Sequence, residues 1–184
     1  MTNNLMHFTA RDVREGLQRI VDRSNPNKRA SDGGNTGCVY GKVENGVLVA
    51  VCIIGQYIAD LGFLGLLLDG GKPDYGNDYS TPGFHGACTI GSSMWDALAA
   101  AGVTFDEDAK ALSRYTQDAQ DSGYKWSDAL RYGTARTIHD AKVTASENLG
   151  VPFTGLSPAP GDFFTEDVPE VEPLAPWERE LLNP

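Results

Sequence analysis

Hydrophobic residues recur along this chain with a spacing that changes from segment to segment, and each spacing predicts a different element. After the capping-box pattern Thr9-Ala10-Arg11-Asp12, the apolar side chains between Val13 and Val21 fall at helical spacing. This pattern predicts a helix that ends near Arg23. Residues 24–36 are rich in Asn, Ser, Gly and basic residues, which is typical of a loop.

The most apolar stretch, residues 37–68, contains the clearest turn signal of the chain. Asn45-Gly46 separates two runs of β-branched and aromatic residues, which predicts a β-hairpin with strands at about 38–44 and 47–51. The spacing then becomes helical over about 53–61, and a glycine follows where that helix should end. We therefore expect a hairpin that leads directly into a short buried helix.

Three further helices are predicted in the second half of the domain. Helical spacing returns at about Ile90, again after Thr104-Phe105-Asp106-Glu107, which has the form of a second capping box, and again from Trp126. A glycine stands at the expected end of each of these helices: Gly102, Gly123 and Gly150. The predicted fold class is α+β, a mostly helical single domain over residues 1–150 with about five helices and one hairpin.

From residue 151 the character of the chain changes. Residues 151–184 are rich in proline and acidic residues, and their apolar residues are isolated from one another. Repeated prolines prevent a continuous helix, so this segment is predicted to be an extended acidic arm that either wraps its own domain or docks on a partner. The hydrophobic content of the chain, 41%, is enough for a core in the domain before it.

Charge is distributed unevenly along the chain. The formal net charge is −10, and seven acidic residues lie in the last part of the chain against Arg179 alone. An acidic chain repels phosphate backbones, which argues against general nucleic-acid binding. Residues 1–29 are the exception because basic residues outnumber acidic ones there, and we interpret them as a solvated helix face.

Two segments combine aromatic or apolar residues with polar ones and are the candidate binding surfaces. One is Asp69–Gly86, a glycine-rich segment predicted to be irregular, and the other is the acidic arm. Isolated apolar anchors flanked by acids are suited to docking on a basic protein surface. The candidate contact residues are Tyr75, Tyr79, Phe84, Phe163, Phe164, Trp177, Leu181 and Leu182.

Cysteine and histidine offer an alternative chemistry. Cys38, Cys52, His85 and Cys88 are the soft metal ligands of the central region, and the last two form a His-x-x-Cys pair. The chain lacks a C-x-x-C pair, and the hairpin register would point Cys38 and Cys52 to opposite faces. A Cys88–His85 dyad would lack an identifiable acid or amide partner. We interpret the cysteines as buried small residues and predict no cofactor, with a metal protein or a thiol-dependent enzyme as the alternative.

The compartment follows from the cysteine count and the first residues. Three cysteines do not make a disulfide framework, and the N-terminal residues show no apolar signal-peptide region, which favours the cytoplasm. Residues 47–68 are long enough to span a bilayer. Asp60 and three glycines oppose a membrane span there, so membrane attachment is not expected.

Two blocks of the sequence carry a resemblance to a known group of proteins. The first is Cys38-Val-Tyr40, a glycine turn and Cys52-Ile-Ile-Gly55, and the second is Gln117-Asp-Ala-Gln120-Asp-Ser-Gly123-Tyr-Lys-Trp126-Ser-Asp-Ala-Leu. Together they resemble small proteins of actinobacteria and their phages, over residues 37–62 and 112–130. The resemblance implies an origin and no particular activity. Gln56 stands where that group usually has a basic residue or histidine, which weakens a catalytic use of this position.

The leading functional hypothesis is a non-enzymatic, phage-encoded protein that binds one host or phage protein in the cytoplasm of the infected bacterium. The acidic arm and the Asp69–Gly86 segment would make the contacts. A structural or assembly component of the virion is the first alternative, and a Cys/His metal protein or thiol enzyme is the second. Assembly into a homo-oligomer stays open.

Overall fold

The computed structural model describes residues 5–25, 27–29, 39–45, 47–65, 83–85, 92–150 and 152–159. Within these ranges the chain forms a mostly helical α+β domain, which confirms the predicted fold class. Its helices are α1 (Ala10–Arg23), α2 (Ile53–Asp60), α4 (Ser92–Ala100), α5 (Glu107–Asp121) and α6 (Trp126–Leu149). Its strands are β1 (Met6–Phe8), β2 (Val39–Glu44), β3 (Val47–Ala50), β4 (Gly83–His85) and β5 (Val103–Phe105).

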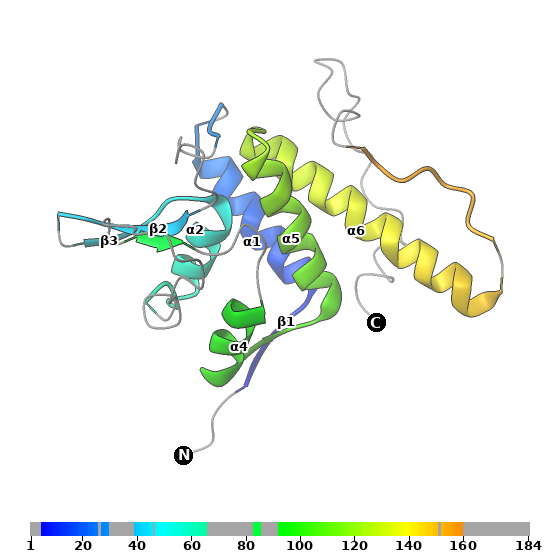
Figure 1. The fold of residues 1–184 in the computed structure, drawn as a ribbon, viewed down its shortest axis with the longest axis horizontal. Coiled ribbons are helices and arrows are strands. Elements are labelled where there is room, and N and C mark those ends of the chain that lie inside the picture. Colours follow the sequence, from blue (N-terminus) through cyan, green and yellow to red (C-terminus); the bar gives the residue numbers. More distant parts are fainter. Residues whose placement is uncertain are drawn as a thin grey trace.

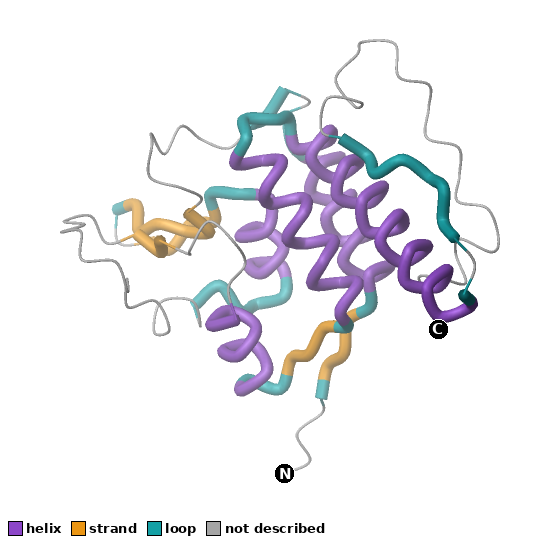
Figure 2. Tube along the Cα trace, turned by 45° about the vertical axis from the view of Figure 1, so that its right-hand side comes forward, coloured by secondary structure: helices purple, strands orange, loops and turns teal. Residues whose placement is uncertain are grey.

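Helices α1, α5 and α6 form the centre of the domain, as Figures 1 and 2 show. The most extensive helix contact joins α5 to α6, and α1 packs against both, while α2 packs on α1. The apolar faces of these helices meet in one core. Its fully buried large residues include Val13, Leu17, Ile20, Ile53, Ile54, Ile58, Leu98, Leu112 and Trp126.

Helix α1 forms as the sequence predicts. The Thr9 side chain accepts a hydrogen bond from the backbone N–H of Asp12, and the Asp12 carboxylate accepts one from the backbone N–H of Thr9. This reciprocal capping box satisfies two N–H groups that a helix leaves unpaired at its start. The predicted inward residues, Val13, Leu17 and Ile20, are buried.

The predicted hairpin is also confirmed. Strands β2 and β3 pair in an antiparallel register that places Glu44 opposite Val47. Asn45 has a φ of 51°, the left-handed conformation that the first central residue of a type I′ turn needs. At the end of α2, Gly62 has a φ of 83°, as expected for a residue that closes a helix.

The sheet around the hairpin is larger than predicted. Residues 83–85, which the sequence assigned to an irregular segment, form β4 and pair antiparallel with the outer edge of β2, giving the order β3-β2-β4. A strand of three residues is too short for a periodic pattern, so only its partner reveals it. The third strand supplies backbone hydrogen bonds to an edge that would otherwise be open.

A second, two-stranded parallel sheet joins the start of the domain to its middle. Strand β1 pairs with β5, with Phe8 opposite Phe105, and no pattern in the sequence predicted either strand. The predicted capping box at Thr104 is therefore wrong. Thr104 lies in β5, where its hydroxyl contacts His7 and the Met6 carbonyl, and Asp106 caps α5 by accepting the N–H of Ala109 at 2.6 Å.

Helix α6 approaches α5 closely at one glycine. A Cβ atom at Gly133 would lie 2.2 Å from Thr116 Oγ1 and 2.9 Å from the Thr116 backbone nitrogen. Because α6 continues beyond this contact, its C-terminal half extends away from the rest of the domain (Figure 1). None of the described helices has the length and apolar character needed to cross a bilayer.

Candidate binding site on helix α6

Most of the predicted contact residues lie outside the described part of the chain. These are Tyr75, Tyr79, Phe163, Phe164, Trp177, Leu181 and Leu182. Phe84 belongs to β4, so it is held on the edge of the three-stranded sheet rather than in an irregular segment. The contribution of these side chains to binding stays a prediction.

Of the four candidate metal ligands, the structure describes the side chain of Cys52. This residue is 2% exposed and caps the N-terminus of α2, where its Sγ accepts the backbone N–H of Gly55 at 3.1 Å. The thiol also contacts Gln117 Oε1 at 3.7 Å. His85 lies in β4, and Cys38 and Cys88 are outside the described residues. Among the side chains that are described, no group of three His, Cys, Asp or Glu residues could hold a metal ion.

The contact of Cys52 with Gln117 belongs to a buried polar network that joins α2 to α5. Gln117 donates to Asp121 Oδ1 at 2.8 Å, and Gln120 Oε1 accepts the backbone N–H of Ile53 at 2.8 Å. The two glutamines therefore satisfy groups at the start of α2 that burial would otherwise leave unpaired. This network brings together the two sequence blocks singled out above, and its geometry gives them a structural role.

Gly55 allows the start of α2 to pack closely against β2. A Cβ atom there would lie 1.9 Å from the carbonyl oxygen of Tyr40, so only glycine lets the start of α2 approach β2 this closely. The Cys-x-x-Gly block is thus explained by the packing of α2. The cysteine serves as a helix cap, which is consistent with our interpretation of it as a buried structural residue.

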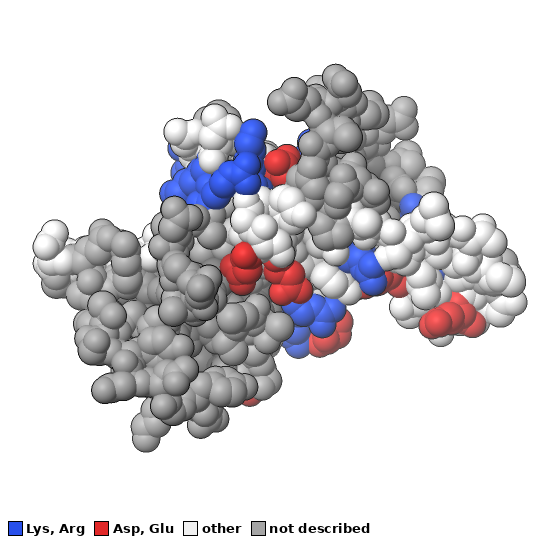
Figure 3. All heavy atoms as spheres, turned by 45° about the horizontal axis from the view of Figure 1, so that its top comes forward, with Lys and Arg blue, Asp and Glu red and all other residues white. Residues whose placement is uncertain are grey.

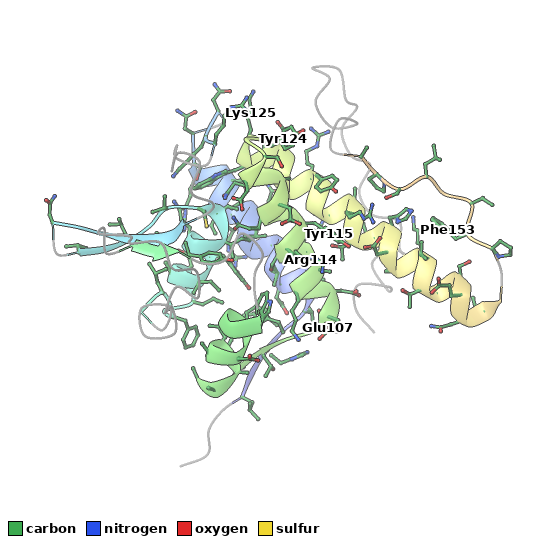
Figure 4. The ribbon with its side chains drawn as sticks, viewed as in Figure 1. Glu107, Arg114, Tyr115, Tyr124, Lys125 and Phe153 are labelled. Carbon is green, nitrogen blue, oxygen red and sulfur yellow. The ribbon has the colours of Figure 1, made fainter. Side chains whose placement is uncertain are left out.

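A second polar cluster lies on the surface where α5 meets α6, and we call it the α6 seat. It consists of Tyr115, Arg136, His139 and Asp140. The Tyr115 hydroxyl donates to Asp140 Oδ2, Arg136 Nε forms an ion pair with Asp140 Oδ1 at 3.3 Å, and His139 Nδ1 lies 3.1 Å from the same oxygen. Tyr115 lies between the two helices (Figure 4).

Asp140 is the electrostatic centre of the α6 seat. Burial by itself would raise the pKa of Asp140, but hydrogen bonds from Tyr115 and His139 and the charge of Arg136 outweigh it and lower the pKa. The carboxylate is therefore ionised near neutral pH, where it interacts with Tyr115, Arg136 and His139. The arrangement fixes the orientation of Arg136 and His139 on the outer face of α6.

Residues 152–159, which we call the arm segment, lie on this face. The chain reverses at Gly150, which has a φ of 66°, and then runs back along α6 without forming a helix or strand (Figures 1 and 2). The Phe153 ring packs edge-on against His139 with centroids 5.3 Å apart, and Arg136 Nη1 donates to Ser157 Oγ. The α6 seat thus holds an extended, proline-containing peptide.

The arm segment is only partly buried against α6. Phe153 is 38% exposed and Leu156 is 93% exposed, so the apolar side chains of this segment are largely outside the core. Exposed apolar side chains on a fixed backbone can contact another surface. The α6 seat therefore orients the beginning of the acidic arm while leaving its side chains accessible.

Sequence reasoning missed the α6 seat. Tyr115 and His139 belong to none of the motifs identified in the sequence. One signal was present: Arg136, His139 and Asp140 are spaced three and four residues apart, so a single helix face carries a cation, a ring and an acid. The sequence could not show that Phe153 and Ser157 lie beside these three residues of α6.

No protein-family model matches this chain, and comparisons with curated proteins and with solved structures find no match either. The fold and the site together define a class, a mostly helical α+β protein in which helix α6 holds an extended segment of the same chain on its surface. Any function has to follow from that geometry and from the chemistry of the chain.

Proposed function

We propose that this chain is a non-enzymatic, phage-encoded protein that binds a host or phage protein in the cytoplasm of a bacterium. The acidic arm that begins at the α6 seat would make the main contacts. The observation that carries this proposal is the arm segment itself, which is extended, anchored at Phe153 and Ser157, and directed along α6 with Leu156 exposed.

The sequence of the arm supplies the chemistry of recognition. Beyond the arm segment it alternates acidic residues with the apolar anchors Phe163, Phe164, Trp177, Leu181 and Leu182. Acidic residues steer association toward a basic surface and raise the on-rate, while a few buried apolar anchors supply most of the binding energy. An arm of this kind can cover a wide surface when it orders on a partner.

The domain contributes a fixed starting point for the arm. An arm whose origin is fixed by Arg136 and His139 loses less conformational entropy on binding than one that is tethered loosely. In this proposal the structural core, including the buried Cys52–Gln117 network, maintains the fold and takes no part in chemistry.

The proposal is tested by affinity capture from host cells that produce the tagged protein, with and without phage infection. The full chain is compared with a truncation that removes residues 157–184 and with the anchor variant Phe163→Ser/Phe164→Ser. Leu149→Ser is the matched control because Leu149 is an exposed apolar residue of α6 outside the arm.

We expect proteins captured by the full chain and by the control to be lost with the truncation and reduced several-fold with the anchor variant. If the truncated chain stays folded by circular dichroism and captures the same proteins at the same level, the arm does not carry the binding and the proposal is wrong.

A further inference from the structure

A group of basic residues lies at the end of the domain where α1 ends and α6 begins, and we call it the basic patch. It consists of Arg23, Lys28, Arg29 and Lys125. Residues 27–29 are attached to this end because the Trp126 N–H donates to the Lys28 carbonyl at 2.9 Å and the Arg29 guanidinium donates to the Gly123 carbonyl. Figure 3 shows lysine and arginine side chains gathered on one part of the surface, and Figure 4 places Lys125 at the start of α6.

The positive charge of the basic patch is only partly neutralised. Arg23 forms an ion pair with Asp60 at 2.8 Å. Among the described residues, no carboxylate forms an ion pair with Lys28, Arg29 or Lys125. The Lys28 ammonium instead lies 4.1 Å from the centre of the Trp126 ring, and burial together with the charge of Arg23 lowers its pKa. Additional negative charge at this site would be favourable.

The arm segment leads the chain toward the basic patch. Phe153 contacts His139 and Ser157 contacts Arg136, so the chain runs back along α6 in the direction of its N-terminus (Figure 2). Lys125 lies about 16 Å further in that direction than Arg136, at a rise of about 1.5 Å per residue. The five residues 158–162 can span about 16–18 Å when extended. Acidic residues from Asp162 onward can therefore reach the patch.

The residues that follow the arm segment in the sequence have the complementary charge. Residues 160–172 contain no lysine or arginine, and their acidic members are Asp162, Glu166, Asp167, Glu170 and Glu172. A segment with this charge and tethered within reach has a high effective concentration at the patch. Attraction between exposed charges at this range is screened by salt.

We infer that the basic patch is the docking site of acidic residues 162–172 of the same chain, which hold the arm against its own domain until a more basic partner competes for it. This inference goes beyond the proposed function, because the docking is a property of the isolated protein. It also implies that a partner can bind the acidic residues of the arm only if its surface is more positively charged than the basic patch.

Zero-length carbodiimide cross-linking of the full chain tests the inference, since it joins an ammonium to a carboxylate only when the two are in contact. We expect peptide links from Lys28 or Lys125 to carboxylates of residues 162–172, lost in 1 M NaCl. Lys110, which contacts Glu107 at 2.6 Å, provides an internal positive control, and it should form no link to the arm. A mixture of unlabelled and ¹⁵N-labelled protein should give no links of mixed isotope.

Charge reversal within the basic patch makes the test more specific. Arg29→Glu should reduce the Lys125–arm link several-fold, while Arg11→Glu, an exposed change elsewhere on α1, should leave it unchanged. The inference is overturned if the Lys110–Glu107 link forms but Lys28 and Lys125 give none to the arm, if Lys110 links to the arm as often, or if the links are of mixed isotope. None of these outcomes bears on arm-dependent partner capture, so the two proposals fail separately.

Discussion

At the scale of single residues, two tyrosine hydroxyls differ in whether they have a hydrogen-bond partner within the described part of the chain. Tyr57 is 3% exposed, packs against Gly16 and Phe8, and its hydroxyl finds no hydrogen-bond partner among the described residues. Tyr115 is half-buried, and its hydroxyl donates to Asp140. A buried group without a partner lowers stability, whereas a satisfied one contributes a modest gain.

We therefore expect opposite results from the same chemical change at these positions. Tyr57→Phe should leave the free energy of unfolding unchanged or raise it by up to about 1 kcal/mol, and Tyr115→Phe should lower it by about 0.5–1.5 kcal/mol. Urea denaturation followed by circular dichroism measures both. A loss of more than about 1 kcal/mol in Tyr57→Phe would mean that its hydroxyl has a partner beyond the described residues.

Asp140 makes a prediction about acid stability. Its pKa is lowered in the folded chain, so its contribution to stability is present above the ordinary pKa of an aspartate and is lost as pH falls through the folded value. Between pH 5 and pH 3, the wild-type chain should lose more free energy of unfolding than Asp140→Asn. Equal losses in the two proteins would show that the α6 seat does not favour the ionised carboxylate.

At the scale of elements, the sequence predicted structure where a segment carries its own pattern. Helix α1 has a complete capping box, the hairpin has Asn45-Gly46, and α6 has a long apolar pattern closed by glycine. Strands β1, β4 and β5 have three residues each and gain their backbone hydrogen bonds from segments far away in the chain. Pairing over such a distance leaves no local signal.

Pairing between distant segments also explains why α5 starts later than the sequence predicts. Both Thr104 and Asp106 are good N-cap residues, and local preference does not separate them. Thr104 is taken by the pairing of β5 with β1, where its hydroxyl bonds to the Met6 carbonyl at 3.3 Å, so Asp106 becomes the cap.

Helices α5 and α6 make a close contact where they cross at Gly133. Gly133→Ala should lower the free energy of unfolding by about 1–3 kcal/mol, because the new methyl group would clash with both the side chain and the backbone of Thr116. Gly65→Ala is the matched control, since a Cβ there meets no atom within 4 Å. Chemical denaturation midpoints compare the two, and equal effects would show that the helices can separate without cost.

At the scale of the whole molecule, the chain divides into a packed helical core and a surface that holds the beginning of an arm. The composition of residues 151–184 predicted the arm, and residues 152–159 are extended as expected. The α6 seat could not be predicted, because it combines residues of α5, α6 and the arm segment that only the fold brings together. The basic N-terminal segment, interpreted as a solvated face, gains a candidate role for the same reason.

The central claim is that the arm of this protein contacts another protein. Site-specific photo-cross-linking in the producing cell tests it most directly, with a benzophenone amino acid in place of Phe164 or of Trp177 and, as a control, in place of exposed Arg11. The account predicts discrete adducts with another protein from the two arm positions and none from the control. Arm positions that give no adduct beyond the chain itself, in uninfected and infected cells alike, would contradict it.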